Sequence, residues 1–109
     1  MAREITLPEG ERDSSIFSGT TSGQTVRRMF DLDQEDDLNE IVKIKIPSGT
    51  SYIDDAFLKG LVSKSIYNLK GLSKFNKKYH FVVLDDNGTV KNVLEGGIQK
   101  GLERLDRRG

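Results

Sequence analysis

Apolar residues recur at helical spacing in the middle of the chain. Across residues 50–69, TSYIDDAFLKGLVSKSIYNL, successive apolar positions are separated by 4, 1, 3, 1, 4 and 3 residues. This spacing places them on one face of a helix. Thr50 or Ser51 is the expected N-cap, and Gly71 fits the C-terminal stop because glycine adopts the left-handed conformation without strain. Gly60 costs about 1 kcal/mol relative to alanine in a helix interior, so we expect another backbone to approach closely there.

Three stretches have the pattern of β-strands. Residues 3–7 (REITL) alternate polar and apolar side chains, and residues 41–47 (IVKIKIP) place isoleucines on one face and lysines on the other. Lysines on the second face indicate an exposed sheet face or a sheet edge. Residues 80–84 (HFVVL) are almost continuously apolar. Such a run is typical of a central strand that is covered on both faces.

Two further helices are indicated, one on either side of these central elements. Residues 25–32 (TVRRMFDL) predict a short helix whose two adjacent arginines, Arg27 and Arg28, are expected at a solvated surface. Residues 90–105 again carry apolar positions at helical spacing, and Asn87 or Thr89 is the expected cap. A pair of glycines at 96 and 97 weakens this helix, so we expect it to fray or break there.

Three polar stretches have some features of ligand-binding motifs, although each also has a simpler structural interpretation. Residues 18–23 (SGTTSG) have the small side chains of a phosphate loop but lack its lysine and glycine spacing, which favours a linker or cap. Residues 31–40 are rich in carboxylates but lack the turn glycine of a calcium loop, which favours a solvated loop. Residues 70–79 interleave lysines with Phe75 and Tyr79, as in single-strand nucleic-acid binders, although four lysines on a loop are usually only solvated.

Composition limits the class of protein. The chain has 109 residues, a length that suits one domain, and its 17 Lys and Arg balance its 17 Asp and Glu. A net charge of zero argues against nucleic acid as the partner. The absence of cysteine excludes disulfides and thiolate metal sites. We find neither the run of about 20 apolar residues that a membrane span needs nor the apolar core of a signal peptide, and we therefore expect a soluble, cytoplasmic protein.

The order of the elements predicts an α/β fold. Strands joined through a helix form right-handed crossovers, so we expect a small mixed sheet with helices packed on it. The domain is expected to span residues 25–105. A strand and a flexible segment (1–24) precede it, and a mobile tail (106–109) follows.

Residues 20–105 resemble a known family. The series IKIPSGTSYIDDAFLKGLV, YHFVVLDD and TVKNVLEGGIQKGLE is similar to the STAS fold of anti-sigma factor antagonists. It is closer still to the bacterial and phage STAS-like domains of unknown function, which carry a small helix, then the strand, then a helix start with a small residue followed by Phe, as in Ala56–Phe57. The resemblance implies a STAS-like α/β domain that regulates other proteins.

The chain departs from this family at the helix start. The resemblance implies that a serine or threonine at the helix start of the antagonists is phosphorylated by a partner kinase. The added negative charge then breaks a docking surface. Here Asp54, Asp55 and Ala56 occupy the candidate positions, none of which has a hydroxyl. Either this protein is not switched by phosphorylation, or Thr50 or Ser51 in the preceding loop takes the role. A further option is that Asp55 imitates a permanently charged state. Both aspartates also simply suit a helix start.

The first functional hypothesis is a non-enzymatic interaction module. One histidine, no cysteine and no serine with a suitably spaced base give no catalytic set. The module would dock a protein partner through the 47–55 loop and the start of the central helix, and the resemblance implies a histidine-kinase-like ATPase as the partner. The expected partner-binding residues are Ser48, Thr50, Ser51, Asp54, Asp55 and Lys59.

The alternative is a domain that binds a small molecule or nucleotide. Ligands of α/β sheets bind beyond the carboxyl ends of the strands, where this chain carries carboxylates. Such carboxylates could hold magnesium with several of its waters retained, and they are also ordinary turn and cap residues. The candidate ligand-binding residues are Asp54, Asp55, Asp85 and Asp86. No cofactor or protein-bound metal site is predicted.

Overall fold

A computed structural model of the protein describes residues 2–8 and 16–108, in which groups of strands alternate with groups of helices. This order confirms the α/β class. The elements are β1 (Ala2–Thr6), β2 (Ile16–Phe17), α1 (Thr20–Met29), α2 (Leu32–Glu35), β3 (Ile41–Ile46), β4 (Tyr52–Ile53), α3 (Asp55–Asn68), α4 (Leu72–Lys78), β5 (Tyr79–Val83) and α5 (Gly88–Arg108).

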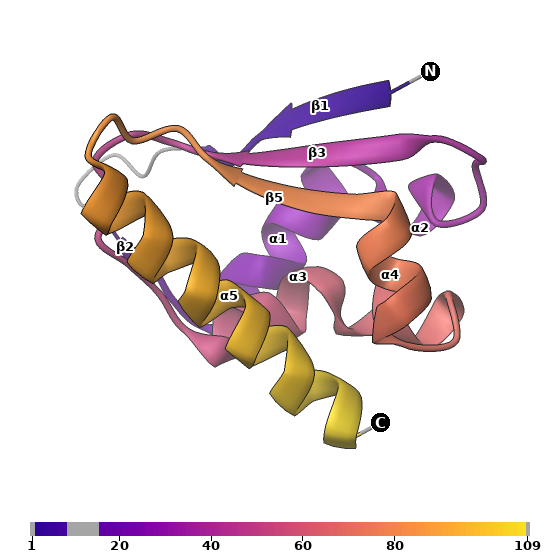
Figure 1. Ribbon diagram of the computed structural model, residues 1–109. Coiled ribbons are helices and arrows are strands. Elements are labelled where there is room, and N and C mark those ends of the chain that lie inside the picture. Colours follow the sequence, from indigo (N-terminus) through magenta and orange to yellow (C-terminus); the bar gives the residue numbers. More distant parts are fainter. Residues whose placement is uncertain (1, 9–15, 109) are drawn as a thin grey trace.

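The main sheet has three strands in the order β1-β3-β5, and both pairings are parallel. The helices lie against one face of this sheet, and the other face is open (Figure 1). β2 and β4 form a separate parallel pair of two residues each. A mixed sheet was expected, but every pairing in the described ranges is parallel. Helical crossovers between successive strands account for this, because parallel neighbours need a long connection.

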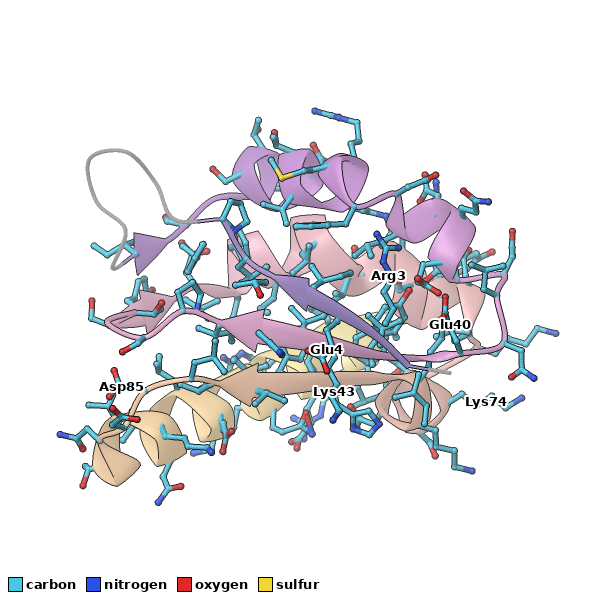
Figure 2. The ribbon with its side chains drawn as sticks, turned by 90° about the horizontal axis from the view of Figure 1, so that it is seen from above. Arg3, Glu4, Glu40, Lys43, Lys74 and Asp85 are labelled. Atoms are coloured by element: carbon cyan, nitrogen blue, oxygen red, sulfur yellow. The ribbon has the colours of Figure 1, made fainter. Side chains whose placement is uncertain are left out.

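Side-chain alternation along β3 separates the two faces of the sheet. Ile44 and Ile46 are buried against the helices, whereas Lys43 is exposed on the open face, as the sequence predicted. Figure 2 looks onto the open face, where Glu4 of β1 lies beside Lys43. Glu4 also forms an ion pair with Lys45. The open face is therefore polar, which suits a sheet face in contact with water.

β5 differs from its prediction. The apolar run at residues 80–84 was expected to be a central strand covered on both faces, but in the described sheet the centre is β3 and β5 lies at one edge. His80 and Leu84 are exposed, and Phe81 and Val82 are only half-buried. That prediction was wrong, because a run of apolar residues does not reveal how many strands lie beyond it.

The central helix α3 begins one turn later than the predicted segment. Asp54, and neither Thr50 nor Ser51, is its N-cap, and the Asp54 carboxylate accepts a hydrogen bond from the Phe57 N–H at 2.7 Å. The Thr50 hydroxyl is buried and donates instead to the Pro47 carbonyl at 2.8 Å. The predicted close approach at Gly60 is confirmed, because α1 crosses α3 there.

Other helices also differ from the sequence-based prediction. α1 begins at Thr20, five residues early, with Gly19 at its N-cap position and Gly23 packed against α3. Of the two interpretations of residues 18–23, a linker or a cap, the structure supports the cap. α2 and α4 are short helices in segments that were expected to be loops. α5 continues through both glycines and through residues 106–108 of the expected tail. Residues 9–15 of the predicted flexible segment lie outside the described residues.

Arg27 is buried, although a solvated position was expected. Only 6% of the residue is exposed. Its guanidinium donates to the Leu61 carbonyl at 2.9 Å and to the Ser65 hydroxyl at 2.7 Å, both on α3. It also donates to Asp33 and, at 2.9 Å, to Asp36. Arg27 therefore ties α1 to α3 and to the residues around α2.

The acidic segment 31–40 is also partly internal, where a solvated loop was expected. The side chain of Asp36 is buried and accepts from Asn68 at 3.0 Å and from the Tyr79 hydroxyl at 2.6 Å, besides Arg27. Burial first, and then the hydrogen bond to Asp36, raises the pKa of Tyr79 far above its usual range. The phenol therefore stays protonated and remains a donor to the buried carboxylate.

Candidate functional site

The candidate site lies at the edge of the sheet where β3 and β5 end. The loop after β3 leads through β4 into the start of α3, and the turn after β5 leads into α5. Asp85 lies in this turn, beyond the end of β5 (Figure 2). This edge is where α/β sheets bind their ligands. The predicted site residues other than Lys59 fall in these loops and at the start of α3.

Asp54 links α3 to the segment after β2. Besides capping α3, its carboxylate accepts from the Ser18 hydroxyl at 2.7 Å and from the Gly19 N–H at 3.2 Å. Burial acts to raise the pKa of Asp54, but the hydrogen bonds from Ser18 and from backbone N–H groups outweigh it and lower the pKa. Both carboxylate oxygens are occupied by internal partners, so Asp54 positions the site.

Asp55 forms a two-bond ion pair with Arg104 of α5. The Arg104 Nε lies 2.6 Å from Oδ2 of Asp55, and a terminal guanidinium nitrogen lies 2.8 Å from Oδ1. Both side chains are half-exposed. The hydrogen bond to Asp55 raises the pKa of Arg104. Gly101 brings the helices together, because a Cβ there would lie 2.7 Å from a methyl of Leu58.

A cleft of about 570 Å³ lies beside this ion pair. Its walls come from β4, from the start of α3 and from α5, and they include Asp55, Arg104, Tyr52 and Val93. Tyr52 is 54% exposed and Val93 is 68% exposed, so both present apolar surface to the solvent. Ile16, the register partner of Tyr52 across the β2–β4 pair, is also exposed. The cleft therefore combines an apolar rim with a paired acid and base.

The strand-end carboxylates do not converge. Asp85 accepts from the Gly49 N–H at 3.1 Å and from the Asn87 N–H at 2.8 Å, and the bonds from Asn87 and Gly49 lower its pKa. Asp85 thus holds the β3 loop against the turn after β5, and Asp86 beside it is exposed. No group of three or more His, Cys, Asp or Glu side chains in residues 2–8 and 16–108 is arranged to hold a metal ion.

The hydroxyl residues of the loop have different environments. Ser48 and Ser51 are exposed, whereas Thr50 is buried with its hydroxyl bonded inside the loop. Of Thr50 and Ser51, the two hydroxyls considered for phosphorylation, only Ser51 is accessible to a partner.

Lys59 lies apart from the other predicted site residues. It lines a second and larger groove of about 820 Å³, formed by α3 from Lys59 onward, the turn after α3 and the end of α5. The contact of Gly101 with Asp55 and Leu58 marks where α5 crosses α3, and Lys59 follows this contact along α3. Of the predicted partner-binding set, three residues line the Tyr52 cleft and Lys59 lines this groove, whereas Ser48 and Thr50 line neither.

The sequence-based interpretation missed Tyr52, Val93 and Arg104. Tyr52 had a usable signal, since it is an aromatic residue directly after a polar loop and outside the apolar stripe of the helix. Arg104 had no such signal in the sequence, because its partner Asp55 lies 49 positions away. Val93 was assigned to the buried face of its helix from spacing alone.

No family model, no curated protein and no solved structure matches the chain. Within the described ranges, no helix is both long enough and apolar enough to cross a membrane.

Proposed function

We propose that this chain is a non-enzymatic regulatory module that docks a protein partner at the cleft between β4 and α5. The observation that carries the proposal is the exposed pair Tyr52 and Val93 beside the Asp55–Arg104 ion pair. Tyrosine and arginine are enriched among the residues that contribute most to binding energy at protein interfaces. An apolar rim with a charged pair inside it suits such an interface.

The rigidity of the cleft supports docking. Tyr52 is held in register with Ile16 by the β2–β4 pair, and Asp54 fixes the loop to the segment after β2. A surface that is already ordered loses little conformational entropy when a partner binds. The cleft therefore favours recognition of a folded partner surface.

The family resemblance adds the class of partner. If the chain is STAS-like, its partner is a histidine-kinase-like ATPase, and the module acts in the cytoplasm, a compartment that suits a cysteine-free chain. Asp55 lies at the helix start, and its carboxylate is paired with Arg104. We propose that docking is controlled by competition for these two charges. Phosphorylation at Ser51 would alter the same cleft, which this residue lines.

The alternative, a nucleotide or small-molecule site built from strand-end carboxylates, has less support. Asp54 and Asp85 both accept hydrogen bonds from neighbouring N–H groups, which reduces their capacity to bind a metal-linked phosphate. Asp55 is already paired with Arg104. Docking of a protein surface, in contrast, needs no carboxylate to bind a metal ion.

The test is quantitative capture of partners from cells of the source organism. Immobilised wild-type protein should retain a partner in stoichiometric amount, and Tyr52→Ala should lose it. Met29→Ala is the matched control, because Met29 is 58% exposed and lies on α1, away from the cleft. Equal capture by all three proteins would refute the proposed surface. An ATP-hydrolysis assay on the captured protein then tests the ATPase assignment.

A further inference from the structure

The groove between α3, from Lys59 onward, and the end of α5 is a second candidate surface. Its volume is about 820 Å³. Ile66, Tyr67 and Leu105 provide its apolar walls. Tyr67 is 79% exposed, more than any other large apolar side chain in residues 2–8 and 16–108. An aromatic ring so exposed beside a groove of this size is typical of an interface residue.

The uncompensated charge around this groove is positive. Lys59 and Lys70 line it, and neither forms an ion pair within the described chain. Lys64, on the same helix, does not line the groove and instead pairs with Asp33 at 3.4 Å. Asp106 is the acid in the wall, and its carboxylate accepts the Leu72 N–H at 3.1 Å. This hydrogen bond leaves the charge of Asp106 in place, so the two lysines and one aspartate of the lining sum to a net charge of +1, which favours a partner with carboxylates.

The spacing of these lysines fits a helical partner. Lys59 lies in the second turn of α3, and Lys70 lies in the turn that follows the end of α3 at Asn68. The part of α3 between them, residues 59–68, is about 14 Å long at the rise of an α-helix. Three turns of a helix cover about the same length. A helix laid in the groove would place carboxylates of its first and last turns near the two lysines. Its apolar face would then cover Tyr67 and Leu105.

We propose that this groove binds a short, acidic, amphipathic helix of a partner protein. The binding mode is a helix in a groove, with apolar side chains at helical spacing as anchors and charges at both ends for orientation. The groove lies beyond the crossing of α5 over α3 from the Tyr52 cleft, and the two share no lining residue. The proposal therefore does not depend on the function proposed for that cleft.

The test uses two synthetic three-turn peptides with the same leucine face. One carries glutamates in its first and last turns, and the other carries lysines there. Each peptide is titrated into ¹⁵N-labelled full-length protein, and amide chemical shifts are followed. The acidic peptide should shift the signals of Tyr67, Lys70 and Leu105 and leave Tyr52 unchanged. The basic peptide should bind at least about tenfold more weakly, since like charges oppose each other at both ends.

Three variants of the protein locate the binding. Tyr67→Ala and Lys59→Glu should each weaken the acidic peptide about tenfold or more, as loss of an anchor residue does. Lys64→Glu is the control, because it makes the same charge change on the same helix outside the groove, and it should leave the affinity within about twofold. Since Tyr67 is mostly exposed, its alanine variant should keep the wild-type circular dichroism spectrum and melting temperature.

Several results would overturn the proposal. Equal affinity for the acidic and basic peptides would exclude recognition by the lysines. An equal loss of affinity in Lys64→Glu would indicate only a response to net charge. Shifts confined to the Tyr52 cleft or to the open sheet face would place the peptide elsewhere. A parallel titration with dodecanoate serves as the small-molecule arm, and binding of dodecanoate alone at Tyr67 would assign the groove to an alkyl carboxylate instead.

Discussion

Gly23 of α1 and Gly60 of α3 face each other where the two helices cross. A Cβ on Gly60 would lie 2.1 Å from the Thr20 carbonyl oxygen, and a Cβ on Gly23 would lie 2.2 Å from the Phe57 carbonyl oxygen. Both obstacles are backbone atoms, which cannot move without separating the helices. The pair therefore sets the distance between α1 and α3, and with it the position of the Arg27 hydrogen bonds that join them.

Gly60→Ala should destabilise the protein, although alanine is the better helix former. The substitution gains about 1 kcal/mol of helix propensity, but inserting a methyl group between packed backbones costs typically 1–3 kcal/mol and more where neither side can yield. We expect the free energy of unfolding to fall by about 2 kcal/mol, measured by urea denaturation. Gly23→Ala should behave in the same way.

Gly96→Ala is the matched control for this prediction. Gly96 also lies inside a helix, but a Cβ there would meet no atom within 4 Å. In this variant only the gain in helix propensity remains, so Gly96→Ala should stabilise the protein by up to about 1 kcal/mol. If Gly60→Ala and Gly96→Ala changed stability in the same direction, the close approach of the helices would not be the cause.

Arg27→Met should be strongly destabilising. The guanidinium donates to the buried carboxylate of Asp36, and its removal would leave that charge without its counter-ion in the interior. Breaking a buried pair on one side costs about 3–5 kcal/mol. Arg28→Met, the exposed neighbour, should change the free energy of unfolding by less than about 0.5 kcal/mol. Thermal and urea unfolding of the two variants give the comparison.

A second substitution separates charge from packing. In Arg27→Met with Asp36→Asn, the buried carboxylate that lost its counter-ion is also removed, and the asparagine still accepts from the Tyr79 hydroxyl. The double variant should therefore be more stable than Arg27→Met alone, with a coupling of about 0.5–3 kcal/mol between the two sites. Additive losses would indicate that Arg27 acts through packing and its bonds to α3.

The elements with a strong apolar period were predictable from the sequence. The fold class follows from the apolar stripe of α3, the alternation of β3 and the apolar positions of α5. The close contact at Gly60 follows from the presence of a glycine inside the predicted helix. Arg27 was not predictable, because two adjacent arginines on a short helix give no sign of which one turns inward. Its burial depends on Asp36 and Ser65, which reach it only after α2 and α3 have packed.

The candidate site was predictable only in part. Asp54 and Asp55 stand out because carboxylates favour the first turn of a helix, but the sequence does not say which of them caps it. The cleft itself depends on α5 crossing α3, and Gly101 permits that contact. Non-local contacts of this kind, such as Asp55 with Arg104, leave no local pattern. The proposed function and family remain predictions that experiments must test.

Asp54 should make stability depend on pH in the acidic range. Its pKa is lowered below the usual value of 3.8, so the unfolded chain binds this proton more readily than the folded protein does. The stabilisation from Asp54 is therefore present above about pH 4 and is lost as the pH falls through the lower folded value. In Asp54→Asn this titration is absent.

The comparison with Asp54→Asn isolates this one carboxylate. At pH 7 the variant should be less stable than the wild type, because asparagine offers one acceptor oxygen where the carboxylate uses two. The gap in free energy of unfolding should stay constant from pH 7 to about pH 5 and should narrow as the pH falls below about 4. Asp33 and Asp85 are present in both proteins, so their contributions to the pH dependence cancel in this difference. Parallel stability curves over this range would contradict the role given to Asp54.

Reversing the charge of Arg104 tests the ion pair of the cleft. Arg104→Glu places a carboxylate beside Asp55 and should lower the melting temperature. Arg107→Glu makes the same change on the same helix at a residue that does not line the cleft, and it serves as the control. In Asp55→Arg with Arg104→Glu the attraction returns, so the melting temperature should recover. Arg104→Glu should also lose partner capture, and the double variant should not regain it, because a docked partner would meet each of the two charges at the wrong position. Recovery of both stability and capture would show that the pair acts only within the fold.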